Sequence, residues 1–263
     1  QVVSGIGNVE HNSILVRYSN DFSIWDLESV NHYKDQTDIF FTCHEFSYNK
    51  IAEAYEPYLG LIRQMFHRYC SGTLEEFMEE CDVYKLQRPV FESYFEKGFC
   101  ERTEQILIDE VEYEQERMRN SIVTMLQKLS EIRPVVIVLN RFQLASKSTM
   151  QLSNSLLQVK NKNIGIVLGV NDVQSIPEFA HEEWDAICDD RNMVYHIGNA
   201  GRNMEPDVMD YYSDYESDDG YRKLNNLVYF LDFDQANHHL SKIERRIKFD
   251  NFTISEKKHY QLL

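Results

Sequence analysis

Two polar residues, Asn140 and Arg141, directly follow a five-residue apolar run at residues 135–139. Such a dense run of β-branched side chains, opened by Pro134, is typical of a strand buried on both faces of a parallel sheet. Ligands of open α/β sheets bind at the carboxyl ends of the strands. There the Asn140 amide could accept a hydrogen bond from a metal-bound water, whereas the Arg141 guanidinium stays protonated and cannot act as a base. These two positions therefore indicate a binding edge without a general base.

A second candidate segment runs from Gly5 to Ser13. A phosphate-binding loop of the form Gly-x-x-x-x-Gly-Lys-Ser/Thr cradles phosphates with backbone N–H groups, pairs with them through its lysine and binds Mg²⁺ through its hydroxyl. With Ser13 as the hydroxyl residue, Asn12 stands where the lysine belongs. With Gly5 as the first glycine, Glu10 stands where the second glycine belongs. Losing the lysine alone removes a contact worth about 2 to 3 kcal/mol. Five residues are interpreted as vestigial phosphate and magnesium positions: Gly5, Gly7, Asn12, Ser13 and Asn140.

Two further groups of residues have types that bind metals, but their spacing does not support a site. In the acidic stretch 207–220, an EF-hand loop starting at Asp214 would need glycine and glutamate where Asp219 and Asn225 stand. We interpret this stretch as a solvated loop, with docking of a basic partner as the alternative. The adjacent His238 and His239 would point about 100° apart on a helix, so they do not easily share a metal. The sequence therefore predicts no metal site.

The composition limits the classes of partner. The formal charge of −16 over 263 residues argues against binding to nucleic acid or to an anionic membrane. Five scattered cysteines without a Cys-x-x-Cys pair, together with the lack of a signal peptide and of a transmembrane run, indicate a cytoplasmic protein with reduced thiols. We expect the chain to be a piece of a longer protein, because it begins inside an apolar strand pattern and stops inside a helical one.

The periodicity of apolar residues predicts strands that alternate with helices, which is typical of a parallel sheet covered on both faces. The expected strands lie at 1–4, 38–43, 135–139, 163–170 and 192–197. The expected helices lie at about 12–18, 58–69, 73–80, 103–132, 148–159, 177–187, 233–247 and 255–263. Capping boxes at Thr73/Glu76 and Ser148/Gln151 open two of these helices. The fold class is therefore a three-layer α/β domain with about five parallel strands.

The predicted organisation has three parts. An α/β domain covers residues 1–198 and carries a helical insert at about 71–132. An acidic loop follows at 199–221. Residues 222–263 form a helical appendage that looks like the start of a further helical unit.

The order of these elements resembles the STAND class of P-loop ATPases, relatives of the AAA+ proteins that include ATPase modules of bacterial signalling regulators. Four stretches carry the resemblance, and together they span residues 1 to about 197: Val2-Val3-Ser4-Gly5, Ala54-Tyr55-Glu56-Pro57-Tyr58, Val135 to Ala145, and Ile166-Val167-Leu168-Gly169. They are similar to the strand entering the phosphate loop, the segment after the second strand, the Walker B strand with the run after it, and the sensor strand.

The resemblance implies an ATPase-like module, and the departures from the motifs imply lost hydrolysis. The Walker B strand of the family ends in two acids, one holding Mg²⁺ and one orienting the attacking water, where this chain has Asn140 and Arg141. The expected function is thus a non-catalytic regulatory or scaffold module of a larger signalling protein, with no bound cofactor and with a protein partner or downstream domains of the same chain. The alternative is a nucleotide-binding switch that binds ATP or ADP through an unorthodox loop, with little or no hydrolysis.

Overall fold

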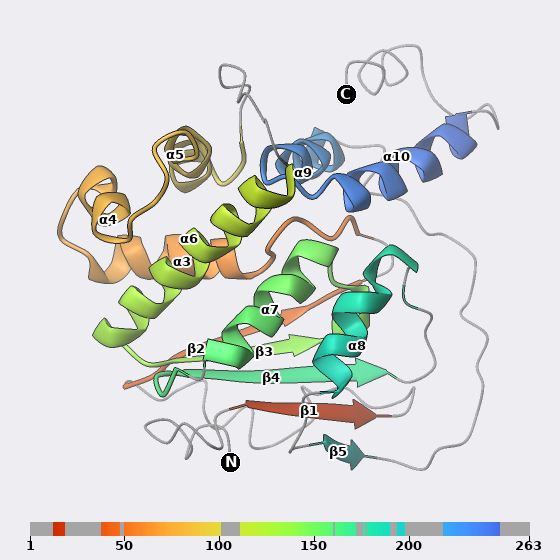
Figure 1. Cartoon of the computed structure of the whole chain (residues 1–263), viewed down its shortest axis with the longest axis horizontal. Coiled ribbons are helices and arrows are strands. Elements are labelled where there is room, and N and C mark those ends of the chain that lie inside the picture. The colour runs from red at the N-terminus through yellow and green to blue at the C-terminus, as the bar shows by residue number, and fades with distance from the viewer. Residues whose placement is uncertain are drawn as a thin grey trace.

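The computed structural model describes residues 13–18, 38–47, 50–100, 111–159, 161–171, 176, 178–189, 194–197 and 218–247. One parallel sheet has the strand order β2-β3-β4-β1-β5 (Figure 1). Its strands are β1 (Ser13–Tyr18), β2 (Phe40–Glu45), β3 (Val135–Asn140), β4 (Ile164–Asn171) and β5 (Val194–Ile197). The parallel α/β class predicted from the alternating pattern is confirmed.

The helix predicted at 12–18 is wrong, because Ser13–Tyr18 is strand β1. β1 lies between β4 and β5, with Leu15 facing Leu168 and Val194 across the sheet. Leu15 and Val16 are both buried, and they belong to the clusters on opposite faces of the sheet. A strand buried on both faces carries a continuous apolar run instead of strict alternation, so its spacing also fits a helix.

The described helices that cover the sheet lie on one face (Figure 1). They are α3 (Tyr58–Tyr69), α6 (Val111–Ile132), α7 (Lys147–Val159) and α8 (His181–Asp189). The connections β2 to β3, β3 to β4 and β4 to β5 all advance in one direction across the sheet, and right-handed crossovers then place their helices on the same side. The described helices do not test the helical layer that was predicted for the other face.

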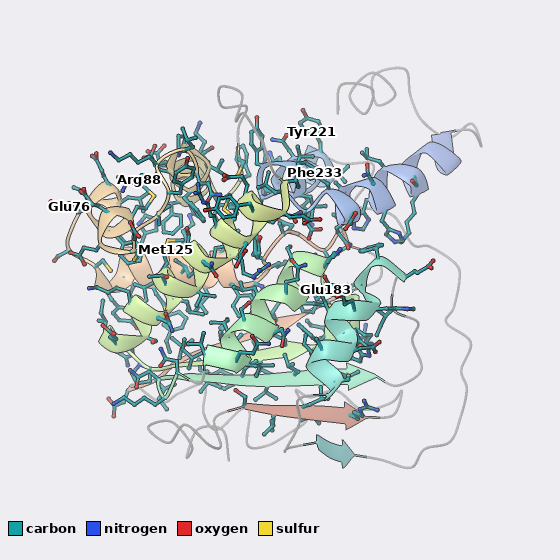
Figure 2. All side chains as sticks on the ribbon, in the orientation of Figure 1. Glu76, Arg88, Met125, Glu183, Tyr221 and Phe233 are labelled. Atoms are coloured by element: carbon teal, nitrogen blue, oxygen red, sulfur yellow. The ribbon has the colours of Figure 1, made fainter. Side chains whose placement is uncertain are left out.

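The core follows the two faces of the central strand β3. Ile137 and Leu139 join the large cluster beneath the helices, whereas Val136 and Val138 join a small cluster on the other face. Successive strand side chains point to opposite faces, which explains the division. Met125 of α6 is buried in the large cluster (Figure 2). None of the described helices is long and apolar enough to cross a membrane.

The helical insert and the helices after residue 217 share this large core. The insert contributes α4 (Leu74–Glu80) and α5 (Arg88–Lys97), with Phe77, Met78 and Phe91 buried. The last described helices are α9 (Asp218–Tyr229) and α10 (Phe233–Ile247). Leu224, Leu227, Phe230 and Ala236 from this pair belong to the same cluster. The α9–α10 pair is therefore packed onto the α/β core.

Several predicted boundaries can be compared with the structure. The capping box at Thr73 is confirmed, with the Glu76 backbone N–H donating to the Thr73 hydroxyl and the Thr73 N–H donating to the Glu76 carboxylate. The box at Ser148 is wrong, because α7 begins at Lys147 and the Ser146 hydroxyl accepts from the Thr149 N–H at 3.2 Å. The predicted acidic loop at 199–221 ends earlier, because α9 begins at Asp218. The helix predicted at 255–263 lies outside the described residues.

Candidate functional site

The carboxyl end of β3 carries the pair of polar residues singled out in the sequence. Asn140 is buried, and its carbonyl oxygen accepts a 3.0 Å hydrogen bond from the Phe46 backbone N–H. Arg141 has φ 53° and ψ 43°, the left-handed conformation, and starts the short turn η2 (Phe142–Leu144). Its Nε lies 3.3 Å from Oε1 of Glu45, at the carboxyl end of β2, and both side chains are about two-fifths exposed. This edge therefore holds a cation already paired with an acid.

The structure does not bring Ser13 and Asn140 together. Ser13 pairs with Ile166 of β4, and Ile166 pairs with Ile137 of β3, three residues before Asn140. Ser13 thus lies at the amino end of β1, about 10 Å away along the strands and two strand spacings across. A phosphate loop follows the carboxyl end of its strand, so Ser13 is not placed to bind the magnesium of a bound triphosphate. Gly5, Gly7 and Asn12 lie outside the described residues.

A second polar pair that sequence reasoning missed joins β2 to the segment before α3. Nε2 of His44 lies 3.5 Å from Oε1 of Glu56. The imidazole packs edge-on against the Phe46 ring, with 4.5 Å between the two ring centres. Burial, followed by the nearby Lys50 charge, lowers the pKa of His44 to about 4. His44 is therefore neutral near pH 7, and a base with so low a pKa is weak at that pH. His44 and Glu56 are separated by eleven residues, so no local sequence signal indicates the pair.

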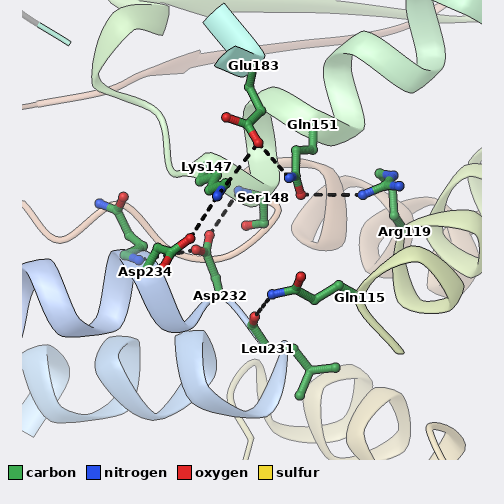
Figure 3. Close-up of polar contacts among 10 residues, drawn as sticks. Gln115, Arg119, Lys147, Ser148, Gln151, Glu183, Leu231, Asp232 and Asp234 are labelled. Carbon is green, nitrogen blue, oxygen red and sulfur yellow. Dashed lines mark hydrogen bonds and ion pairs between the residues drawn. The ribbon is translucent and has the colours of Figure 1, made fainter. Parts of the chain in front are cut away.

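The N-terminus of α7 is the centre of a buried polar network that the sequence did not reveal (Figure 3). The Asp232 carboxylate accepts from the backbone N–H of Ser148 at 3.0 Å and from that of Gln235 at 3.3 Å. One carboxylate therefore satisfies an unpaired donor at the start of two helices, α7 and α10. Burial raises the pKa of the Asp232 carboxyl, although hydrogen bonds from Ser148, Gln235 and Ser146 oppose that shift.

Charged side chains surround this contact (Figure 3). The Lys147 ammonium lies 2.8 Å from the Asp234 carboxylate of α10 and 3.8 Å from the Glu183 carboxylate of α8. Glu183 also accepts from the Gln151 amide at 2.8 Å, and the Gln151 oxygen accepts from Arg119 of α6 at 3.4 Å. Polar contacts thus join α6, α7, α8 and α10 around one helix end.

Serine and threonine hydroxyls tie the segment before α3 to the same helix end. The Tyr55 backbone N–H donates to the Ser148 hydroxyl at 3.2 Å, and the Thr149 hydroxyl donates to the Glu56 carbonyl at 3.1 Å. Tyr55 has φ 55°, and the following Glu56-Pro57 bond is cis. The Tyr58 hydroxyl lies 2.7 Å from that of Ser153, further along α7. The Ala54–Tyr58 stretch is thus held on α7.

An apolar contact completes the docking of α9 and α10. The Phe230 ring, just after α9, meets the rings of Tyr55, Phe91 and Tyr94 edge-on at 6.1, 5.8 and 5.6 Å. The next residue, Leu231, has φ 64°, and its carbonyl accepts from the Gln115 amide of α6 at 2.6 Å. Residues 230–232 therefore contact four parts of the molecule: the segment before α3, α5, α6 and the N-terminus of α7.

Among the described residues, no group of three or more histidine, cysteine, aspartate or glutamate side chains is arranged to hold a metal ion. Along that same part of the chain, the carboxyl edge offers the ion pair Glu45–Arg141 and the contact between neutral His44 and the Glu56 carboxylate. The sequence does indicate one of the two hydrogen bonds of Asp232, the one from the Gln235 N–H in its own helix. An aspartate directly before the apolar stripe that begins at Phe233 is a helix N-cap pattern. Comparison of the chain with protein-family models, curated proteins and solved structures gave no match.

Proposed function

We propose that the chain is a non-catalytic, ATPase-like regulatory or scaffold module of a larger cytoplasmic bacterial signalling protein. It acts through contacts with a protein partner or with other domains of its own chain, and it uses no bound cofactor. The observation that carries the proposal is the ion pair between Arg141 and Glu45 at the carboxyl end of β3. In the ATPases that the sequence resembles, this position supplies the acid that orients water, and a paired guanidinium cannot take a proton.

The docking of α9 and α10 supports the regulatory part of the proposal. Asp232 contacts the N-terminus of α7 directly, and α7 follows the turn that begins at Arg141. Ser148, which contacts Asp232, is only seven residues after Arg141 in the sequence. A change at the carboxyl edge of β3 can therefore reach the last described helices through a short stretch of chain. Any domain that follows α10 in the protein would receive such a change through these helices.

One feature of the topology favours the alternative, a nucleotide-binding switch. From β1 the chain passes to β2 at the far edge of the sheet, whereas the later connections advance in the opposite direction. This reversal makes β1 a topological switch point, where ligands of open α/β sheets bind beyond the carboxyl ends of the strands. A nucleotide would then bind beyond Tyr18, and the loss of a base at Arg141 would still prevent efficient hydrolysis.

Nucleotide binding and hydrolysis can be measured separately. We expect no phosphate release above buffer from ATP and Mg²⁺, and no stabilisation by ATP, ADP or GTP at millimolar concentration. Stabilisation above about 1 kcal/mol would mean binding tighter than about millimolar, and the switch would replace the scaffold as the preferred function. If phosphate release occurs, Asn140→Ala and Arg141→Ala show whether it depends on this edge.

The regulatory role has its own test in the longer protein. Size-exclusion and pull-down experiments compare the full protein with one carrying Asp232→Ala. We expect the substitution to change association between this module and the remaining domains. A module that stays monomeric and indifferent to those domains in both proteins contradicts the proposal.

A further inference from the structure

A cluster of exposed apolar side chains lies on the helical insert. Six large apolar residues are exposed in the part of the chain that the structure describes: Tyr84, Leu86, Val111, Tyr113, Ile132 and Val159. Four of them lie in the link between α4 and α5 or in the first turn of α6, and Leu86 and Tyr113 are 57% and 49% exposed. We name Tyr84, Leu86, Val111, Tyr113 and the adjacent Arg117 the insert patch.

Contacts within the protein position the two tyrosine rings of the insert patch. The Arg117 guanidinium lies between the rings of Tyr84 and Tyr113, 4.1 and 4.2 Å from their centres. It also donates to the Tyr113 hydroxyl at 2.8 Å. The Gln87 amide donates to the Glu114 carbonyl at 3.0 Å and to its carboxylate at 2.9 Å, which fixes the α4–α5 link against α6. Fixed aromatic rings lose little entropy on binding, and tyrosine and arginine are enriched among residues that dominate interfaces.

The charge beside the insert patch selects the kind of partner. Glu112 and Glu116, together with Val111 and Tyr113, line an open depression at the start of α6. Neither glutamate has an ion-pair partner within the described part of the chain, in contrast to Glu114, which pairs with Arg117 at 3.5 Å. The chain as a whole carries a formal charge of −16. A positively charged side chain would therefore be attracted to this depression while its apolar neighbour covers the tyrosines.

We infer that the insert patch is a docking surface for a protein segment that presents lysine or arginine beside an apolar side chain. This inference rests on the proposed function, because it names the surface and the partner chemistry of a module that acts through protein contacts. The carboxyl edge of the sheet takes no part in it, and the α9–α10 link contacts this turn of α6 through Gln115, which is not a patch residue. A segment of this chemistry buries its apolar side chain on Leu86 and Tyr113 and pairs its cation with Glu112 or Glu116.

A synthetic amphipathic helix of leucine and lysine serves as the probe, with binding measured by fluorescence anisotropy. Leu86→Ser and Tyr113→Ala should each weaken binding at least about fivefold. Ile132→Ser and Val159→Ser, which remove exposed apolar side chains elsewhere, should leave binding unchanged. The pair Glu112→Gln and Glu116→Gln should weaken binding more than Glu75→Gln with Glu131→Gln, which removes the same charge from other exposed sites. Circular dichroism verifies that each variant is folded.

The same peptide with glutamate in place of lysine should not bind. The inference is overturned if the lysine peptide does not bind, if the glutamate peptide binds equally well, or if the control variants weaken binding as much as the patch variants do. The last result would mean general attraction to an acidic protein. The assay contains no nucleotide and no downstream domain. Each of these results would therefore refute the docking surface without affecting the nucleotide and association tests of the proposed function.

Discussion

The Asp232 carboxylate accepts a 3.0 Å hydrogen bond from the backbone N–H of Ser148, a residue 84 positions earlier in the chain. The same carboxylate caps its own helix through Gln235. Because Asp232 is buried, removing its side chain leaves both donors without water as a replacement. This single side chain therefore joins the last described helices to the turn that follows β3.

Replacing Asp232 with alanine should lower the free energy of unfolding by about 2 to 4 kcal/mol, because two buried N–H groups lose their acceptor. Urea denaturation measures the change. Asp234→Ala is the matched control, since Asp234 lies two residues away and pairs with Lys147, but its side chain is 54% exposed. An exposed pair of this kind should cost less than about 1 kcal/mol. Equal losses in the two variants would contradict the capping role of Asp232.

Replacing Phe230 with alanine should cost about 3 to 5 kcal/mol, the range for a fully buried phenylalanine. Its ring fills the space between Tyr55, Phe91 and Tyr94. Phe230→Leu keeps most of the volume and should cost clearly less. Hydrogen exchange followed by mass spectrometry should show that the alanine substitution accelerates exchange more in α9 and α10 than in β3 and β4. Uniformly faster exchange would mean that the helices do not open separately from the core.

His239 gives the stability a defined dependence on pH. It is buried and lies 2.8 Å from the Gln235 amide. Burial, followed by the charges of Lys242 and His238, lowers the pKa of His239 from 6.5 to about 3. Between these values the unfolded chain binds more protons than the native state, so the stability that neutral His239 provides is lost as the pH falls from 6.5 toward 3.

The measurement compares unfolding free energies of the wild type and His239→Gln between pH 4 and 8. The wild type should lose up to about 1.4 kcal/mol per pH unit more than the variant below pH 6.5, and the difference should be constant above pH 7.5. His44, whose pKa is lowered to about 4, adds a loss of the same sign to both proteins. Parallel curves for the two proteins over the whole range would show that His239 does not titrate as inferred.

Arg141 should tolerate glycine better than alanine. Its φ of 53° disfavours any residue with a Cβ atom, whereas glycine adopts this conformation freely. Both substitutions remove the ion pair with Glu45, so their difference isolates the backbone effect, and Arg141→Gly should be more stable than Arg141→Ala by about 0.5 to 1 kcal/mol. Lys128 of α6 is the control, because it also forms an exposed ion pair, with Glu80 at 3.3 Å. There the order should reverse, since glycine weakens a helix.

Much of the fold could be predicted from the sequence because the relevant signals are local. The apolar run at 135–139 is β3, the stripe at 58–69 is α3, and Thr73 caps α4 as its spacing with Glu76 indicates. The misassignment of Ser13–Tyr18 has an equally clear cause. Leu15 and Val16 are buried on opposite faces by β1's position inside the sheet, and that position depends on the neighbours β4 and β5.

The sequence by itself determined most of the described helices and strands, Ser13–Tyr18 excepted, and which charges stand at the end of β3, because these properties depend on residues a few positions apart. Only the tertiary structure decided that Arg141 pairs with Glu45, that Phe230 meets three aromatic rings and that Asp232 caps α7. Such contacts form when the apolar faces of distant segments are buried together, and the polar groups carried along must then find partners in the interior. No periodicity within one segment records which distant partner that will be.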